Sequence, residues 1–177
     1  MRKRKIYFAG KFQPESGVPF ERMLLNDYRA NMLGLDHDQS VMTSGVPTEV
    51  QDGFLYCGSF FLKDDVDVAD TRTIVANDLA SLEESDAVIA VLYDEPSIGT
   101  TSELVSAAGN GKDIFIIHPY QETRYKLKSE YWFAITLSSV FCERNGRHFR
   151  SVQVDRLTNE VIDREIRGFL HEMESWD

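Results

Sequence analysis

The sequence predicts an α/β doubly wound sandwich, which is a parallel β-sheet with helices on both faces. The first observation is a set of short, continuously apolar segments, of which Ala87–Tyr93 is the clearest, and such segments are typical of strands covered on both faces. The second is their alternation with longer segments whose apolar residues have helical spacing. No repeat, low-complexity stretch or linker interrupts residues 1–177, so we expect a single domain.

Five segments are expected to form the parallel sheet. The first is short and apolar and ends at Gly10, whereas the second lies in a stretch that several Gly and Pro residues interrupt. That stretch, residues 45–62, is either a substrate-facing lid that excludes water or a core-packing strand. The expected strands are Lys5–Ala9, Phe54–Leu62, Ala87–Tyr93, Asp113–His118 and Ala134–Cys142.

Four segments with helical spacing are expected to cover the sheet. Gly34 and Gly109–Gly111 would end the first and third of them. In the second, Ile74, Leu79 and Leu82 lie near one face. The expected helices are Phe20–Leu33, Asp70 or Thr71 to Glu84, Thr100–Ala108 and Leu157–Met173, the last with its apolar face at Val161, Ile162, Ile166, Phe169 and Leu170.

Charge and composition argue against several classes of protein. The chain has 19 Lys and Arg against 29 Asp and Glu, and a net charge of −10 disfavours binding of long nucleic acids. The one dense basic cluster, Arg2–Lys5, is either a solvated start of the chain or a short nucleic-acid arm. No apolar run could span a membrane and no signal peptide is legible. Two cysteines, Cys57 and Cys142, are too few for a disulfide scaffold, so we expect a cytoplasmic protein.

Ligands of parallel α/β sheets bind beyond the carboxyl ends of the strands. This rule selects three segments: Gly10–Gln13, Asp94–Glu103 and His118–Gln121. Neither a dinucleotide fingerprint nor a P-loop occurs in the chain. The four histidines have no metal-ligand spacing, so we expect no metal and no organic cofactor, and His118 is only a weak binding candidate.

Glu103 is the candidate nucleophile. We expect it in the first turn of the helix that follows the central strand, after the small polar run Gly99–Ser102. The positive end of the helix dipole would keep a carboxylate there ionised, as a nucleophile requires. An ordinary role in stabilising its own helix fits the same position.

Two further side chains are candidates for the same site. Tyr7 lies in the first strand, and if it is buried its hydroxyl needs a partner, which Glu103 would supply. Asp78, on the helix before the central strand, is either a second carboxylate of the site or part of a solvated helix face. Asp86 directly precedes the central strand and is expected to be a turn or capping residue.

In their order and spacing, four segments resemble the nucleoside 2-deoxyribosyltransferases. The resemblance covers roughly residues 4–120, with a weaker continuation at Asn145–Arg147 and in the last helix. The segments are Ile6–Gly10, Asn77–Leu79, Ser85–Val91 and Gly99–Glu103, and Ala107–Lys112 also fits the family pattern.

The resemblance implies a flavodoxin-like fold and a cofactor-free enzyme acting on nucleosides and nucleobases in nucleotide salvage. Glu103 would attack C1′ of a 2′-deoxynucleoside, and a second base would then take the sugar from the deoxyribosyl-enzyme. Asp78 would assist at the sugar and the leaving base, Tyr7 would position the nucleophile, and Phe12 and Gln13 would lie beside the base. The family also implies a homo-oligomer, with residues 123–150, including Tyr131, Trp132 and Phe133, as the expected contact.

The chain departs from the family where a base-contacting Asp usually precedes the Gly of the Gly-x-x-x-Glu segment. Pro96, Ser97 and Ile98 stand there instead. Asp94 or Glu95 could reach the base from further back, or Ser97 could replace the hydrogen bond, while Gly10 and Gly99 remain candidate substrate contacts.

Two rival functions therefore stay open. One is an N-glycoside hydrolase that acts on a nucleoside or a nucleoside 5′-monophosphate, with Lys11 either meeting the phosphate or simply solvated. The other is a nucleotide-binding module without turnover.

Overall fold

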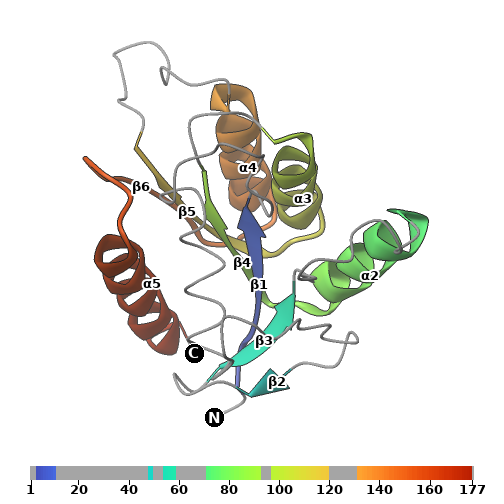
Figure 1. The fold of residues 1–177 in the computed structure, drawn as a ribbon, viewed down its shortest axis with the longest axis horizontal. Helices are drawn as coiled ribbons and strands as arrows, with labels where there is room; N and C mark the ends of the chain where they lie inside the picture. Colours follow the sequence, from blue (N-terminus) through green and yellow to red (C-terminus); the bar gives the residue numbers. More distant parts are fainter. Residues whose placement is uncertain are drawn as a thin grey trace.

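A computed structural model of the chain describes residues 3–10, 48–49, 54–58, 71–92, 97–119 and 131–176 (Figure 1). Helices and strands alternate through most of the described part. In chain order the elements are β1 (Lys5–Gly10), β2 (Thr48–Glu49), β3 (Leu55–Gly58), α2 (Thr71–Glu84), β4 (Ala87–Val91), α3 (Ile98–Gly109), β5 (Asp113–His118), α4 (Trp132–Arg144), β6 (Phe149–Gln153) and α5 (Asn159–Glu174).

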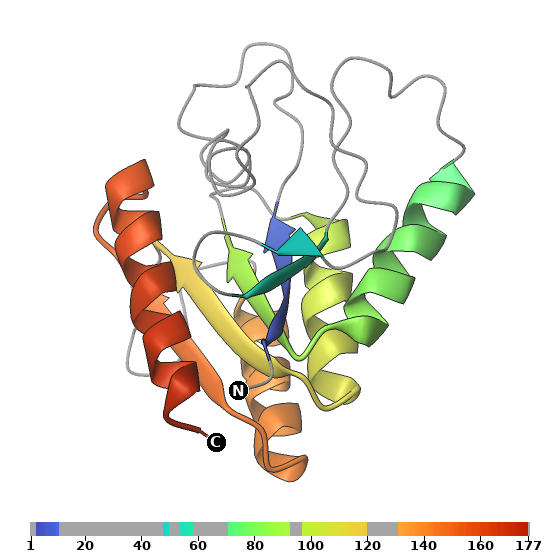
Figure 2. The ribbon, with the colours of Figure 1, turned by 90° about the horizontal axis from the view of Figure 1, so that it is seen from below.

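The strands form one sheet in the order β2-β3-β1-β4-β5-β6. All pairings are parallel except that of the two-residue edge strand β2, which runs antiparallel to β3. The five parallel strands thus have the order 2-1-3-4-5 of flavodoxin-like folds. Helices α2, α3 and α4 cover one face and α5 the other (Figures 1 and 2). The predicted fold class, a flavodoxin-like sandwich, is confirmed.

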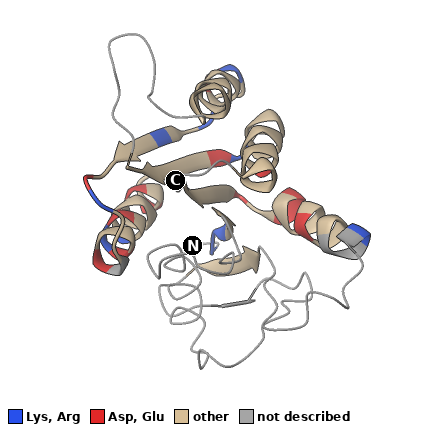
Figure 3. Ribbon diagram, turned by 45° about the horizontal axis from the view of Figure 1, so that its top comes forward, with Lys and Arg blue, Asp and Glu red and all other residues tan. Residues whose placement is uncertain are grey.

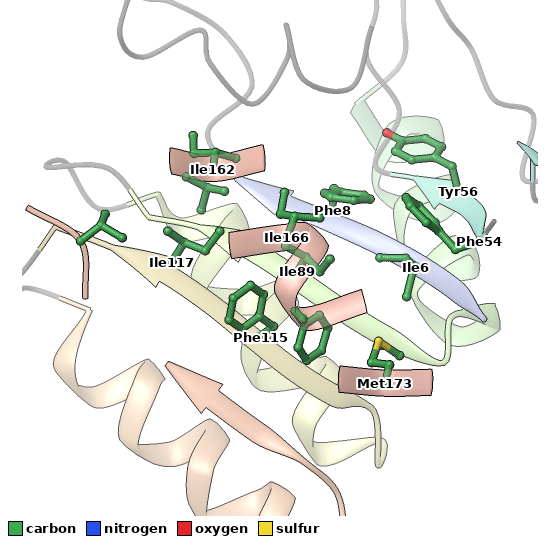
Figure 4. Packing of buried hydrophobic residues seen from close by; sticks show 14 residues of the cluster. Ile6, Phe8, Phe54, Tyr56, Ile89, Phe115, Ile117, Ile162, Ile166 and Met173 are labelled. Carbon is green, nitrogen blue, oxygen red and sulfur yellow. The ribbon is translucent and has the colours of Figure 1, made fainter. Parts of the chain in front are cut away.

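The core on the α5 face is built by apolar side chains that alternate along the strands. The rings of Phe115 on β5 and Phe169 on α5 stack with centroids 4.4 Å apart. Thr158 caps α5, because its side chain accepts the N–H of Val161. The buried residues of α5 recur every three or four positions: Ile162, Ile166, Phe169 and Met173. Figure 4 shows Ile162, Ile166 and Met173 over the sheet, while Val161 and Leu170 of the predicted apolar face are partly buried.

On the opposite face, the sheet packs against α2, α3 and α4. Strand alternation sends Ile6 and Phe8 toward α5 and Tyr7 and Ala9 toward α3. Leu104 of α3 is fully buried in the same cluster as Tyr7. Tyr7 therefore faces the helix that carries Glu103.

The prediction of a fifth strand at Ala134–Cys142 is wrong, because these residues lie within helix α4. Its β-branched and apolar residues favoured a strand. However, Ala134, Ser138 and Cys142 are buried four residues apart, which is helical spacing. The sheet's last parallel strand is β6 instead, a partly polar and half-buried edge strand that the apolar pattern did not reveal.

Other boundaries need smaller corrections. Leu79 of α2 is 46% exposed, so it does not share the buried face of Leu82. Phe54 and Tyr56 are buried in the α5-side core, as the core-strand interpretation of this stretch requires. The predicted helix Phe20–Leu33 lies outside the described residues.

At the amino-terminal edge of the sheet, Asp86, expected to be a turn or capping residue, lies between α2 and β4 and bonds to the start of β1. Its carboxylate accepts the backbone N–H of Lys5 at 2.8 Å, and its own N–H donates to the Lys5 carbonyl. These bonds join the start of β1 to the start of β4.

Both cysteines are buried and neither forms a disulfide. Burial raises the pKa of Cys57 to about 12 and that of Cys142 to about 11. A thiol that resists ionisation is a poor nucleophile, so these side chains are not candidates for covalent catalysis. Among the described helices, none is long and apolar enough to cross a membrane.

Basic and acidic residues are interspersed along α5 (Figure 3). Arg167 pairs with Asp163 and Arg164 pairs with Glu165 on that helix. Exposed pairs of this kind contribute little to stability, so the fold depends on the apolar core.

We predict that Phe169→Ala lowers the free energy of unfolding by about 3–5 kcal/mol, because it removes a fully buried ring and leaves a cavity. The matched control is Phe133→Ala, since Phe133 is 59% exposed and its loss should cost less than about 1 kcal/mol. Urea denaturation measures both. Equal losses in the two variants would contradict this account of the core.

Candidate active site

A tyrosine hydroxyl and a carboxylate meet between β1 and α3. The ring of Tyr7 is fully buried in the middle of β1, and its hydroxyl donates a hydrogen bond to Oε1 of Glu103 at 2.8 Å. Glu103 is half-buried. The contact expected from the sequence is therefore present, across 96 residues of chain.

Glu103 lies further along its helix than the sequence suggested. Helix α3 begins at Ile98, and Ser97 is its N-cap, so the run Gly99–Ser102 is helical and Glu103 falls in the second turn. The field of the helix dipole fades beyond the first turn. The predicted place of Glu103 in the first turn is therefore wrong, and the hydrogen-bond donor that the structure supplies to its carboxylate is the Tyr7 hydroxyl.

Gly58 packs against the ring of Tyr7. It pairs with Tyr7 across β3 and β1, where the register shifts between Ile6 and Tyr7, and it has φ +144°. A Cβ atom on Gly58 would lie 3.2 Å from Cε2 of Tyr7 and 3.1 Å from Cβ of Ser81. The absence of a side chain at Gly58 thus lets β1, β3 and α2 approach one another beside the Tyr7 ring.

The contact between Gly58 and Ser81 shows which side of α2 carries Asp78. Asp78 lies one turn before Ser81 and Leu82, so all three share the sheet-facing side of α2, and Asp78 is half-buried. Helix α2 ends next to the start of β4 and therefore runs against the strand direction. Asp78 lies about 4.5 Å beyond Ser81 toward the carboxyl edge of the sheet. Tyr7, Glu103 and Asp78 thus come from β1, α3 and α2, which adjoin one another, and the two helices cover the same face of the sheet.

Ser97 has a structural role that the sequence did not reveal. Its hydroxyl accepts the N–H of Thr100 at 3.4 Å, and its carbonyl accepts the N–H of Thr101 at 3.0 Å. Its own N–H donates to the hydroxyl of Tyr131 at 2.7 Å. Ser97 therefore caps α3, and its predicted contact with a substrate stays a prediction.

Tyr131, for which an oligomer contact stays a prediction, is 2% exposed within this chain and bonded to Ser97. Its neighbours Trp132 and Phe133 are exposed at the start of α4, with exposed fractions of 46% and 59%. The sequence could not indicate the role of Tyr131, or those of Gly58 and Ser81, because each depends on contacts between distant segments.

The remaining candidates divide into described and undescribed residues. Gly10 ends β1 at the carboxyl edge of the sheet, and Gly99 is exposed in the first turn of α3. His118 is buried, and its Nε2 lies 2.9 Å from Oγ of Ser151 on β6. The predicted contacts at Phe12, Gln13 and Asp94, together with Lys11 and Glu95, lie outside the described residues.

Metal-ligating side chains do not gather in the described ranges. No group of three or more His, Cys, Asp or Glu residues there could hold a metal ion. The candidate site residues Tyr7, Glu103 and Asp78 carry hydroxyl and carboxylate groups.

Comparisons with known proteins add little. No protein-family model matches the chain, and no curated protein matches it at a significant level. One solved structure that it resembles is a 2-deoxyribosyltransferase from Bacillus psychrosaccharolyticus, with 19% sequence identity, a TM-score of 0.37, and coverage of 67% of this chain and 75% of that one. Similarity at this level does not identify a function, so we infer function from the geometry of the site.

We predict that Gly58→Ala destabilises the protein by about 1–3 kcal/mol, because φ +144° is strained for any residue with a Cβ atom and that atom would press on Tyr7 and Ser81. The matched control is Gly168→Ala in α5, where nothing lies within 4 Å of the added methyl group and the unfolded chain loses entropy. That variant should be about as stable as the wild type or slightly more so. Chemical denaturation of both variants tests the difference, and a harmless Gly58→Ala would contradict it.

Proposed function

We propose that this protein transfers 2-deoxyribose between nucleobases, with Glu103 as the nucleophile. The observation that carries the proposal is the 2.8 Å hydrogen bond from the Tyr7 hydroxyl to the Glu103 carboxylate. A buried tyrosine that orients a half-buried carboxylate on the helix after the central strand is a suitable arrangement for attack on an electrophilic carbon.

The reaction consists of two displacements at C1′ of the sugar. In the first, an oxygen of Glu103 bonds to C1′ while the bond from C1′ to the base nitrogen breaks, and the base leaves with that electron pair and receives a proton. In the second, a nitrogen of the incoming base bonds to C1′, releases the carboxylate and loses its proton. Two inversions retain the configuration, and each step passes through a cation-like state that a carboxylate stabilises.

Tyr7 and Asp78 have separate roles in this scheme. Tyr7 holds the carboxylate of Glu103 in one orientation through the 2.8 Å hydrogen bond, which lowers the entropy lost on reaching the attacking geometry. Asp78, from α2, assists at the sugar and supplies or accepts the proton of the base. Because Ser97 already caps α3, Asp94 or Glu95 is the better candidate for the base contact that the family usually makes just before the glycine matching Gly99. Phe12 and Gln13 lie beside the base in this proposal.

We predict that Glu103→Gln lowers base exchange by at least about 10³-fold, because an amide cannot serve as the nucleophile. The assay supplies a 2′-deoxynucleoside and a second free base to the purified chain, and it measures the new nucleoside. The matched control is Glu143→Gln, an exposed glutamate near the end of helix α4, which should exchange at the wild-type rate.

The same assay separates the rival functions. Product that forms only when an acceptor base is present supports transfer. Release of free sugar at the same rate with and without acceptor would establish hydrolysis in place of transfer. Binding without either product would establish a binding module and overturn the proposal.

We predict that Tyr7→Phe lowers kcat by about 10- to 100-fold, since it removes one hydrogen bond to a charged group and keeps the ring. The acidic limb of the pH profile should move to higher pH, because a carboxylate that loses a donor is protonated more easily. Tyr56→Phe is the control, since Tyr56 is equally buried but faces α5. Equal kinetics in Tyr7→Phe and Tyr56→Phe would contradict the orienting role of Tyr7.

A further inference from the structure

Tyr131 connects the start of α4 to the start of the helix that carries Glu103. The residue directly precedes α4, is 2% exposed, and packs in the same apolar cluster as Leu104 of α3. Its hydroxyl accepts the backbone N–H of Ser97 at 2.7 Å. This is a short contact between two segments 34 residues apart in the chain.

The residue that donates this bond, Ser97, is the N-cap of α3. Ser97 uses its hydroxyl for the N–H of Thr100 and its carbonyl for the N–H of Thr101, so its backbone N–H is the group left to point away from the helix. Tyr131 accepts from that group. The N-cap is therefore tied to α3 by two of its groups and to the segment before α4 by the third.

Displacement of the N-cap would reach Glu103 through the helix. Glu103 follows Ser97 by six residues, about 9 Å along the axis, within a single helix whose backbone hydrogen bonds make it rigid. At its own position Glu103 is bonded to Tyr7 of β1. Two tyrosine hydroxyls from different elements thus contact the same half of α3, one at the cap and one in the second turn.

We propose that Tyr131 is a positioning residue, which fixes α3 so that the Glu103 carboxylate meets the Tyr7 hydroxyl. The inference rests on the proposed function for its kinetic consequence, but its structural part does not. Without the Tyr131 hydroxyl, the Ser97 N–H loses this acceptor, the first turn of α3 moves, and the contact between Tyr7 and Glu103 lengthens. A longer contact favours the protonated form of Glu103.

The test compares Tyr131→Phe with Tyr56→Phe, which removes the hydroxyl of an equally buried tyrosine on the opposite face of the sheet. In Tyr131→Phe we expect the backbone amide signals of Ser97, Thr100 and Glu103 to shift in two-dimensional NMR spectra and the Ser97 amide to exchange faster with solvent. We also expect kcat to fall about 5- to 10-fold, with KM changed less than about twofold. The acidic limb of the plot of kcat/KM against pH should move to higher pH by about half a unit or more. Tyr56→Phe should change none of these.

Unmoved amide signals from Ser97 to Glu103, or an acidic limb that stays at the wild-type pH in Tyr131→Phe, would overturn the proposal and leave Tyr131 a purely structural residue. If Tyr131→Phe does not fold, 3-fluorotyrosine at position 131 keeps the ring and hydroxyl but weakens the acceptor, and the same two measurements decide. A wild-type chain without transfer or hydrolysis would defeat the proposed function. The amide signals would then still test whether Tyr131 positions Glu103.

Discussion

The hydrogen bond between Tyr7 and Glu103 connects the central part of the sheet to the helix beside it. A fully buried tyrosine hydroxyl without a partner would cost about 1–3 kcal/mol, so the position of Tyr7 on β1 requires an acceptor on the facing helix. That acceptor is a carboxylate, a group that is costly to bury unless it is hydrogen-bonded. Each group therefore accounts for the burial of the other, and replacing either with an apolar side chain removes this hydrogen bond from the one that remains.

The rest of the fold makes this meeting possible. Because the five strands are parallel, their carboxyl ends lie at one edge, and the segments that follow them gather there. Strand alternation turns Tyr7 toward α3, and Gly58 on the neighbouring strand leaves room for its ring. Helix α2 runs beside Gly58 in the direction opposite to the strands, so its residue Asp78 lies toward the carboxyl edge of the sheet. Strands β1 and β3 and helix α2 thus pack together at Gly58, where any residue with a Cβ atom would be strained.

How far the sequence predicts this structure depends on how local each signal is. Strands β4 and β5 and helix α5 follow from continuous apolar runs and from apolar spacing within one element. Helix α4 was missed because Ile135, Thr136 and Val140 favour a strand locally, while packing against α3 decides for a helix. The predicted start of α3 is two residues late, although its N-cap Ser97 makes the local bond to the Thr100 N–H that is typical of helix caps. The pair of Tyr7 and Glu103 could be anticipated, since a buried hydroxyl needs a partner on a facing helix.

The most direct test of the central claim is to look for the covalent intermediate. The chain is incubated with a 2′-deoxynucleoside without an acceptor base, quenched within the first turnovers, digested, and analysed by mass spectrometry. The account predicts a 2-deoxyribosyl group on the peptide that contains Glu103, and on no other peptide. A chain that turns over its substrate yet carries no such group, or carries it on another residue, would contradict the assignment of Glu103 as the nucleophile.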